Sequence, residues 1–138
     1  MKKLLVDAGP LIALFDKSDS YHKQALDHFR ILNEIPVTTW PVITEVSHML
    51  GFHIDAQTGF LEWIDLGGLE IFSLSSLDIA RILELTRKYS NVPMDLADAS
   101  MVVVSEHLQT QRILSVDTDF YIFSNRFKDM LINEFVIS

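Results

Sequence analysis

"NVPMDLADASMVVVSEHL", residues 91–108, is the stretch that decides the fold. Its second half is an almost unbroken apolar run, which predicts an element buried in the protein interior. The run nevertheless opens with two carboxylates, Asp95 and Asp98. Asp95 is placed to cap a helix N-terminus, where its side chain accepts backbone N–H bonds. Asp98 falls in the first helical turn among apolar neighbours, so we expect it to be partly buried, where a carboxylate without a partner is costly.

The composition is that of a single compact domain spanning residues 1–138. Apolar residues make up 49% of the chain, which is enough for a real core. The absence of cysteine excludes disulfides, thiolate zinc sites and a cysteine nucleophile. No apolar run approaches the roughly 20 residues that span a bilayer, and Asp7 interrupts the apolar N-terminal stretch. We therefore expect a soluble, cytoplasmic protein with no membrane partner.

Short apolar runs alternate with amphipathic segments along the chain. Strands are predicted at residues 3–6, 36–39, 69–74 and 112–117, with a fifth at 133–138 on a sheet edge. Helices are predicted at residues 11–16, 18–32, 42–50, 56–66 and 79–89, and another opens at Asp95. In helix 79–89 we expect Ile79, Ile82, Leu83 and Tyr89 on one side. This alternation predicts an α/β fold: a three-layer α/β/α domain with a mainly parallel central sheet of about five strands.

Acidic residues recur where the predicted strands end. Asp7 follows the first strand, Glu45 lies early in the helix after the second, and Asp117 ends the fourth, with Asp119 close behind. Taken singly, each has an ordinary structural role at a strand end, on a solvent-facing helix position or in a loop. Together with Asp98 they fall at the carboxyl edge of the sheet, where open α/β sheets bind ligands. Clustered carboxylates repel one another, and a hard divalent cation such as Mg²⁺ or Mn²⁺ removes that repulsion.

The net charge of −8 bears on the choice of partner. An acidic protein is a poor general binder of phosphate backbones, which are held by lysine and arginine. Either nucleic acid is not the partner, or the acidity is concentrated where a metal cation offsets it. A metal-holding cluster of carboxylates would allow an acidic protein to act on RNA or DNA.

Four segments, in this order, resemble the PIN-domain nucleases, especially the VapC-like toxins of toxin–antitoxin modules. The segments are "LLVDAGPLIALFD" (4–16), "ITEV" (43–46), "MDLADASMV" (94–102) and "ILSVDTDF" (113–120). The resemblance covers nearly the whole chain and implies a PIN-like fold. One departure is Ala8, since many relatives carry a hydroxyl residue directly after the first aspartate. That departure leaves the implied metal ligands intact.

The resemblance implies an acidic quartet formed by Asp7, Glu45, Asp98 and Asp117. In the family, the residues at the positions of Asp7 and Asp98 are the usual Mg²⁺ ligands, and Mn²⁺ can substitute. Glu45 would position metal-bound water or a second ion, and Asp117 would complete the pocket. Secondary roles fall to Asp119, as a nearby acid, and to Ser115, whose hydroxyl would orient Asp117. Substrate contacts are expected at the basic residues that flank the last acidic segment: Arg112, Arg126 and Lys128.

The family also implies an activity and partners. The expected reaction is endoribonuclease cleavage of RNA phosphodiester bonds by metal-activated water, without a covalent enzyme intermediate. The expected partners are an RNA substrate, a second copy of the chain in a homodimer, and a cognate antitoxin whose tail occupies the active-site groove. The expected biological role is that of the toxin of a type II toxin–antitoxin pair.

Two other functions stay open at this point. One is a catalytically weak or inactive PIN-like scaffold that binds RNA or protein. The other is an aspartyl-phosphate hydrolase, which also places an aspartate after the first strand but needs a second one two residues later, where this chain has Gly9. The two tryptophans, Trp40 and Trp63, are expected in the core or at a dimer contact rather than in base stacking.

Overall fold

The computed structural model describes residues 2–92, 94–116 and 130–135. Its central sheet contains five strands in the order β3-β2-β1-β4-β5, and each described pairing is parallel. The strands are β1 (Leu5–Val6), β2 (Val37–Thr38), β3 (Glu70–Ile71), β4 (Arg112–Leu114) and β5 (Ile132–Asn133). The predicted α/β class and the mainly parallel five-stranded sheet are confirmed.

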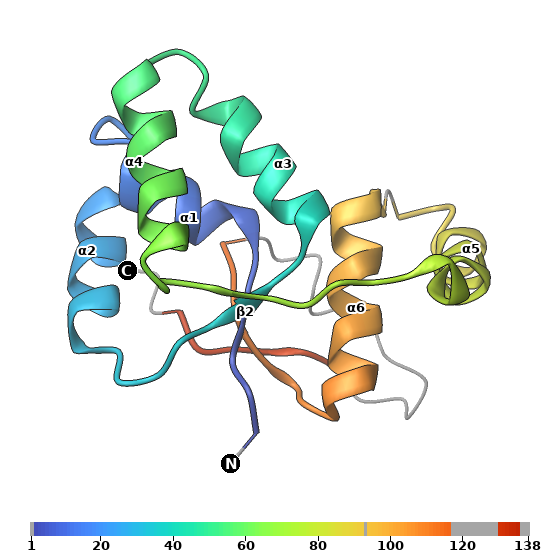
Figure 1. Cartoon of the computed structure of the whole chain (residues 1–138). Helices are drawn as coiled ribbons and strands as arrows, with labels where there is room; N and C mark the ends of the chain where they lie inside the picture. Colours follow the sequence, from blue (N-terminus) through green and yellow to red (C-terminus); the bar gives the residue numbers. More distant parts are fainter. Residues whose placement is uncertain (1, 93, 117–129, 136–138) are drawn as a thin grey trace.

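Two groups of helices cover the sheet (Figure 1). The helices are α1 (Ala8–Phe15), α2 (His22–Ile31), α3 (Trp40–Met49), α4 (Ile54–Asp65), the 3₁₀ turn η1 (Ser76–Asp78), α5 (Ile79–Lys88) and α6 (Leu96–Leu108). The connections from β1 to β2 and from β2 to β3 move the same way across the sheet, whereas the connection from β3 to β4 moves back. Because parallel crossovers are right-handed, α1 to α4 cover one face and α5 and α6 cover the other. Among the described residues, no helix is both long and apolar enough to cross a membrane.

The sequence located each element, but several boundaries differ. Helix α1 begins at Ala8, directly after Asp7, rather than at Leu11. The chain can turn into the helix at once because Asp7 has the extended backbone of an N-cap and Pro10 fits the first helical turn. The fifth strand does lie on an edge, but β5 ends at Asn133; Glu134 and Phe135 of the predicted strand 133–138 are not strand, and residues 136–138 lie outside the described residues.

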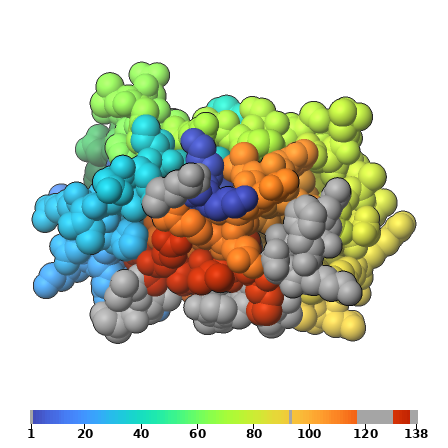
Figure 2. Space-filling view, turned by 90° about the horizontal axis from the view of Figure 1, so that it is seen from below, coloured from blue at the N-terminus to red at the C-terminus, as the bar shows by residue number. Residues whose placement is uncertain are grey.

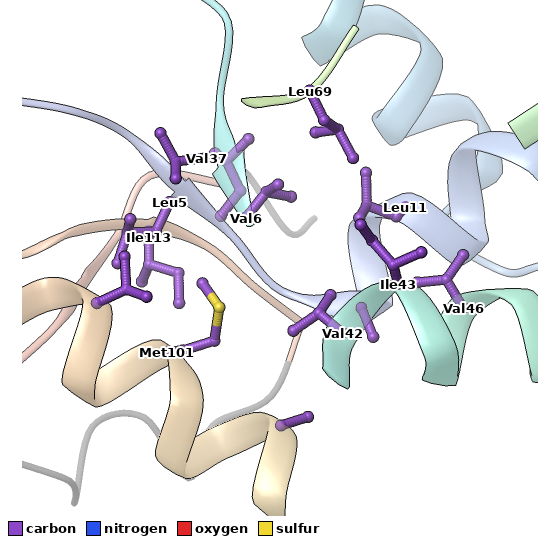
Figure 3. Packing of buried hydrophobic residues seen from close by; sticks show 14 of the residues in the cluster. Leu5, Val6, Leu11, Val37, Val42, Ile43, Val46, Leu69, Met101 and Ile113 are labelled. Atoms are coloured by element: carbon purple, nitrogen blue, oxygen red, sulfur yellow. The ribbon is translucent and has the colours of Figure 1, made fainter. Parts of the chain in front are cut away.

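The core lies on both faces of the short strands. Figure 3 shows the sheet residues Leu5, Val6, Val37 and Ile113 gathered in one cluster with Met101 of α6, Leu11 of α1, and Val42, Ile43 and Val46 of α3. Helix α6 is buried continuously from Ala97 to Glu106. A helix buried on all sides needs no polar face, which explains why "ASMVVVSEHL" lacks helical periodicity.

Helix α5 packs on α6 through a side that overlaps the predicted one: the prediction is right for Ile82 and Tyr89, and it missed Leu85. Leu85 and Tyr89 are buried, whereas Ile79 and Leu83 are 58% and 46% exposed, so the predicted stripe is wrong for those two. Polar contacts add to this packing: Arg81 Nη2 forms an ion pair with Glu106 Oε2 at 2.7 Å, and His107 Nε2 lies 2.7 Å from Asp78 Oδ1. The spacing of apolar residues alone did not distinguish the predicted side of the helix from the side that contains Leu85, because Ile82 fits either one.

Gly9 is required by close packing. A Cβ built on Gly9 would lie 2.0 Å from Val116 Cγ2, whereas a Cβ on Gly59, in helix α4, would meet nothing nearer than 3.9 Å. Because the valine side chain is stiff, the chain after β4 would have to shift to admit a methyl group at Gly9.

We therefore expect opposite effects from two alanine substitutions, measured as the free energy of unfolding in urea. Gly9→Ala should lower it by about 1–3 kcal/mol through overpacking. Gly59→Ala should leave it unchanged or raise it by up to about 1 kcal/mol, because alanine favours helix over glycine. Equal effects of the two substitutions would contradict the packing assigned to Gly9.

Candidate functional site

The topology creates a switch point beside strand β1. Strand β1 lies between β2 and β4, and the connections on its two sides run on opposite faces of the sheet. In open parallel sheets, the crevice beyond the carboxyl ends of two such strands is the usual ligand site. Asp7 follows β1 and Ser115 follows β4, so both residues lie at this crevice.

Asp7 is held at the crevice by the sheet. Its backbone N–H donates to Leu114 O at 2.9 Å, continuing the pairing of β1 with β4. Asp7 is the N-cap of α1, but its side chain makes no capping hydrogen bond. The carboxylate is only 6% exposed and accepts a long hydrogen bond of 3.4 Å from Ser115 Oγ at Oδ2. The carboxylate thus contacts the residue after β4 and does not cap the helix.

Asp95 and Asp98 form a capping box at the start of α6. The Asp98 N–H donates to Asp95 Oδ1 at 2.8 Å, and the Asp95 N–H donates to Asp98 Oδ2 at 3.3 Å. The N-cap role predicted for Asp95 is confirmed. The reciprocal bond from Asp98 was missed, although the D-x-x-D spacing that produces it is visible in the sequence. It fixes the Asp98 carboxylate relative to the helix.

Asp98 is difficult to ionise in this position. Burial raises the pKa of its carboxyl group to about 8, and the negative charges of Asp95 and Asp7 add to the increase. Asp98 is 8% exposed, so its predicted burial is confirmed. The influence of Asp7 on Asp98 means that the structure brings together two acids that are far apart in the sequence. Two buried carboxylates supply the hard oxygen ligands that Mg²⁺ and Mn²⁺ prefer.

Buried hydroxyls support the same end of the sheet. The Ser100 hydroxyl donates to Ala97 O at 2.7 Å and lies 2.7 Å from Thr39 Oγ1, which links the residue after β2 to the first turns of α6. Thr38 Oγ1 donates to Val6 O at 2.9 Å. Sequence reasoning missed these residues, because a serine or threonine inside an apolar run does not reveal its partner. They hold the start of α6 against the strand ends.

Glu45 lies on α3, across a groove from the start of α6. It is exposed on α3 and lines a groove of about 590 Å³ together with Trp40, His48, Asp95 and Leu96. Within residues 2–92, 94–116 and 130–135, no three Asp, Glu or His side chains are grouped so as to hold a metal ion. The described part of the quartet therefore consists of Asp7 and Asp98, with Glu45 at the neighbouring groove.

The other predicted site residues fall into two groups. Asp117, Asp119, Arg126 and Lys128 lie outside the described residues. Arg112 is described, and the substrate role predicted for it is not supported. It begins β4 and thus lies at the opposite end of the strand from Ser115, with ion pairs to Glu34 and Glu134 at 2.7 Å each. Those carboxylates raise the pKa of its guanidinium group and satisfy its charge inside the protein.

Figure 2 gives a view of one face of the molecule in which the N-terminal residues (blue) lie beside segments coloured cyan, orange and red. The hydrogen bonds agree with this meeting of distant segments, because Arg112 Nη1 also donates to Lys2 O at 2.7 Å. Proximity in sequence to the last acidic segment was therefore a poor guide to the position of Arg112.

The tryptophans differ from each other. Trp63 is half-buried and packs against Phe15 and Phe29, with ring centroids 5.5 and 5.9 Å apart. Trp40 is 57% exposed at the start of α3, so it is not a core residue. The expected core position is met by Trp63, whereas a dimer contact at Trp40 stays a prediction.

Comparison with known proteins identifies the family. Residues 4–125 match the sequence family described as the PIN domain. The chain belongs to the PIN domain family. This PIN domain is similar to Ribonuclease VapC26 of Mycobacterium tuberculosis, with 22% identity over 116 residues that cover 83% of this chain and 86% of the relative. Its fold is similar to the crystal structure of Mycobacterium tuberculosis VapC20, a sarcin–ricin loop cleaving toxin, with a TM-score of 0.76 and 17% identity, covering 85% of this PIN domain and 92% of that chain.

The carboxylate pair predicts a pH-dependent stability when divalent metal is removed by a chelator. The pKa of Asp98 is about 8 in the folded protein against an ordinary value of 3.8. Between these values the folded state holds a proton that the unfolded state has lost. The free energy of unfolding should therefore fall as the pH rises from about 4 to about 8.

The measurement is urea denaturation at a series of pH values in the presence of EDTA. Asp98→Asn should make the dependence shallower, because asparagine does not titrate, while its side-chain oxygen can still accept from the Asp95 N–H. Asp65→Asn, at an exposed position on α4, is the matched control and should retain the wild-type slope. Identical slopes for wild type and Asp98→Asn would show that Asp98 is not the titrating group.

Proposed function

We propose that this PIN domain is a metal-dependent endoribonuclease that hydrolyses RNA phosphodiester bonds. The observation that carries the proposal is the pair of buried carboxylates, Asp7 and Asp98, at the topological switch point of the sheet. Burial and like charge oppose the ionisation of Asp98, so the pair is poorly suited to a purely structural role. Perturbed acids in such a crevice are typical of functional sites.

The residues fit a hard divalent cation. Asp7 and Asp98 would be its protein ligands, and Glu45 and Asp117 are proposed to complete the acidic set from the groove and from the segment after β4. A bound Mg²⁺ or Mn²⁺ would neutralise phosphate charge and lower the pKa of a coordinated water. Carboxylate ligation also explains how a chain of net charge −8 can act on a polyanion.

The chain itself positions these carboxylates before any cation binds. The capping box fixes Asp98 at the start of α6, and the Ser115 hydroxyl contacts Asp7. Low exposure of both acids limits competition from bulk water, which strengthens their electrostatic interaction with a bound ion. The protein thus supplies an arrangement of ligands that requires little reorganisation on binding.

The relatives extend the proposal to a biological role. One relative is named a ribonuclease and the structural neighbour is described as a toxin that cleaves the sarcin–ricin loop. By analogy we propose that this chain is the cytoplasmic toxin of a type II pair, acts as a homodimer and is inhibited by a cognate antitoxin. Its choice of RNA depends on loops and charge placement rather than on fold.

An inactive scaffold is the alternative function. It is favoured by the position of Glu45, which is exposed and does not group with Asp7 and Asp98 in the described residues. Calorimetric titration with Mn²⁺ separates the two functions, because the proposed nuclease needs a bound divalent cation. A protein that binds no Mn²⁺ at millimolar concentration would be the scaffold. The aspartyl-phosphate hydrolase is disfavoured, since Gly9 occupies the required second acid position and packs closely on Val116.

The nuclease proposal predicts loss of RNA cleavage when either carboxylate is neutralised. Asp7→Asn and Asp98→Asn should each lower kcat about 100-fold or more, because each removes a charge needed to hold the cation. EDTA should abolish wild-type cleavage, and added Mg²⁺ or Mn²⁺ should restore it. The assay is the rate of cleavage of a structured RNA, followed on a denaturing gel.

Asp65→Asn is again the control, because it removes one aspartate charge at an exposed site and should cleave as wild type does. Retention of full activity by both active-site variants, or cleavage that persists in EDTA, would contradict the proposal. Circular dichroism of each variant checks that loss of activity does not reflect unfolding.

A further inference from the structure

Asn133 replaces a main-chain partner at the end of strand β4. The main-chain pairing of β4 with β5 runs as far as Glu134, whose N–H donates to Ile113 O at 2.7 Å. Ser115 lies two residues after Ile113 and is paired instead by the Asn133 side chain. The Ser115 N–H donates to Asn133 Oδ1 at 3.0 Å, and Asn133 Nδ2 donates to Ser115 O at 2.7 Å.

The same carboxamide turns the following chain away from the sheet. The Phe135 N–H donates to Asn133 Oδ1 at 2.9 Å, which is the side-chain turn typical of asparagine. With two N–H groups on one atom and one carbonyl on the other, the orientation of the amide is determined by its partners. Asn133 therefore ends β5 and extends the pairing of β4 by one residue.

That extra residue is the one that contacts the carboxylate pair. Ser115 is completely buried, and its Oγ donates to Asp7 Oδ2 at 3.4 Å. Removing the Asn133 carboxamide would leave the buried N–H and C=O of Ser115 without this partner, an arrangement that costs roughly 1–3 kcal/mol per group. The chain would relax to recover hydrogen bonds, and the hydroxyl would move with the backbone of Ser115.

We propose that Asn133 is a positioning residue for the active site: it holds the backbone of Ser115 so that the serine hydroxyl orients Asp7. The inference rests on the proposed nuclease function for its catalytic readout, but the linkage from Asn133 through Ser115 to Asp7 is a structural claim of its own. Asn133 reaches the site from the edge strand, without contacting substrate.

The first experiment compares Asn133→Ala with Glu134→Ala. Both remove polar contacts at neighbouring positions, because Glu134 pairs with Arg112 at 2.7 Å. Asn133→Ala should lower kcat for RNA cleavage about 10-fold or more while KM changes less than about threefold, as expected for a residue that orients a metal ligand. Glu134→Ala should lower the melting temperature with little change in kcat. Equal kcat values for the two variants would overturn the proposal.

Asn133→Asp is a second variant that keeps the proposal testable if Asn133→Ala does not fold. Its carboxylate can still accept from the Ser115 and Phe135 N–H groups, but it no longer donates to Ser115 O and turns a second oxygen toward that carbonyl. It should fold and give a kcat between those of wild type and Asn133→Ala. A kcat for Asn133→Asp equal to that of wild type would show that the lost bond is not needed to position the site.

A double-mutant cycle tests whether Asn133 acts through Ser115. Ser115→Ala removes the hydroxyl and keeps the backbone groups, so in that background Asn133→Ala should lower kcat less than about twofold further. A general loss of stability would instead make the two effects multiply, which would overturn the assigned route.

The carboxyl ¹³C chemical shift of Asp7, measured by NMR in EDTA, separates failure of this inference from failure of the proposed function. The shift should change in Asn133→Ala and Ser115→Ala but not in Glu134→Ala. If the wild-type protein does not cleave RNA but the variants show this pattern of shifts, the nuclease proposal is refuted and the linkage from Asn133 to Asp7 is retained. If the wild-type protein cleaves RNA but the Asp7 shift does not change in Asn133→Ala, the linkage alone is refuted.

Discussion

The burial of two carboxylates, Asp7 and Asp98, is the constraint on which the candidate site depends. Asp7 and Asp98 are each less than a tenth exposed, and the charge on Asp7 opposes ionisation of Asp98. Such a pair persists only if hydrogen bonds hold each side chain and if a proton or a cation offsets the charge. Asp98 is held by the capping box of α6 and Asp7 is contacted by Ser115. The support that surrounds the site follows from the cost of keeping two acids together.

The topology brings these acids to the same end of the sheet. Strand β1 ends at Asp7, and the crossover that carries α6 returns on the opposite face of the sheet from α1. Because α6 is buried along most of its length, its position is set by packing rather than by the acid at its start. Burial of Met101 and its neighbours thus provides the stability that allows Asp98 to remain in an unfavourable position.

Polar side chains act as substitutes for main chain around the site. Asn133 takes the place of a strand neighbour for Ser115, and Asp95 and Asp98 take the place of a preceding helical turn for α6. Each substitution occurs where a regular element stops and leaves backbone groups that need partners. The ends of strands and helices are therefore where this fold can place functional side chains with defined orientation.

By itself the sequence determined the α/β order of elements, the capping role of Asp95, the burial of α6 and the concentration of acids at strand ends. These features depend on local spacing and on the contrast between apolar and polar residues, which a single chain displays directly. Only the tertiary structure decided that Asp7 lies near enough to raise the pKa of Asp98 while Glu45 faces a neighbouring groove. It also decided that Arg112 pairs with Glu34 and Glu134, and that α5 packs through Leu85. Those outcomes depend on which side of an element faces another, and on partners far apart in the chain, so local pattern does not contain them.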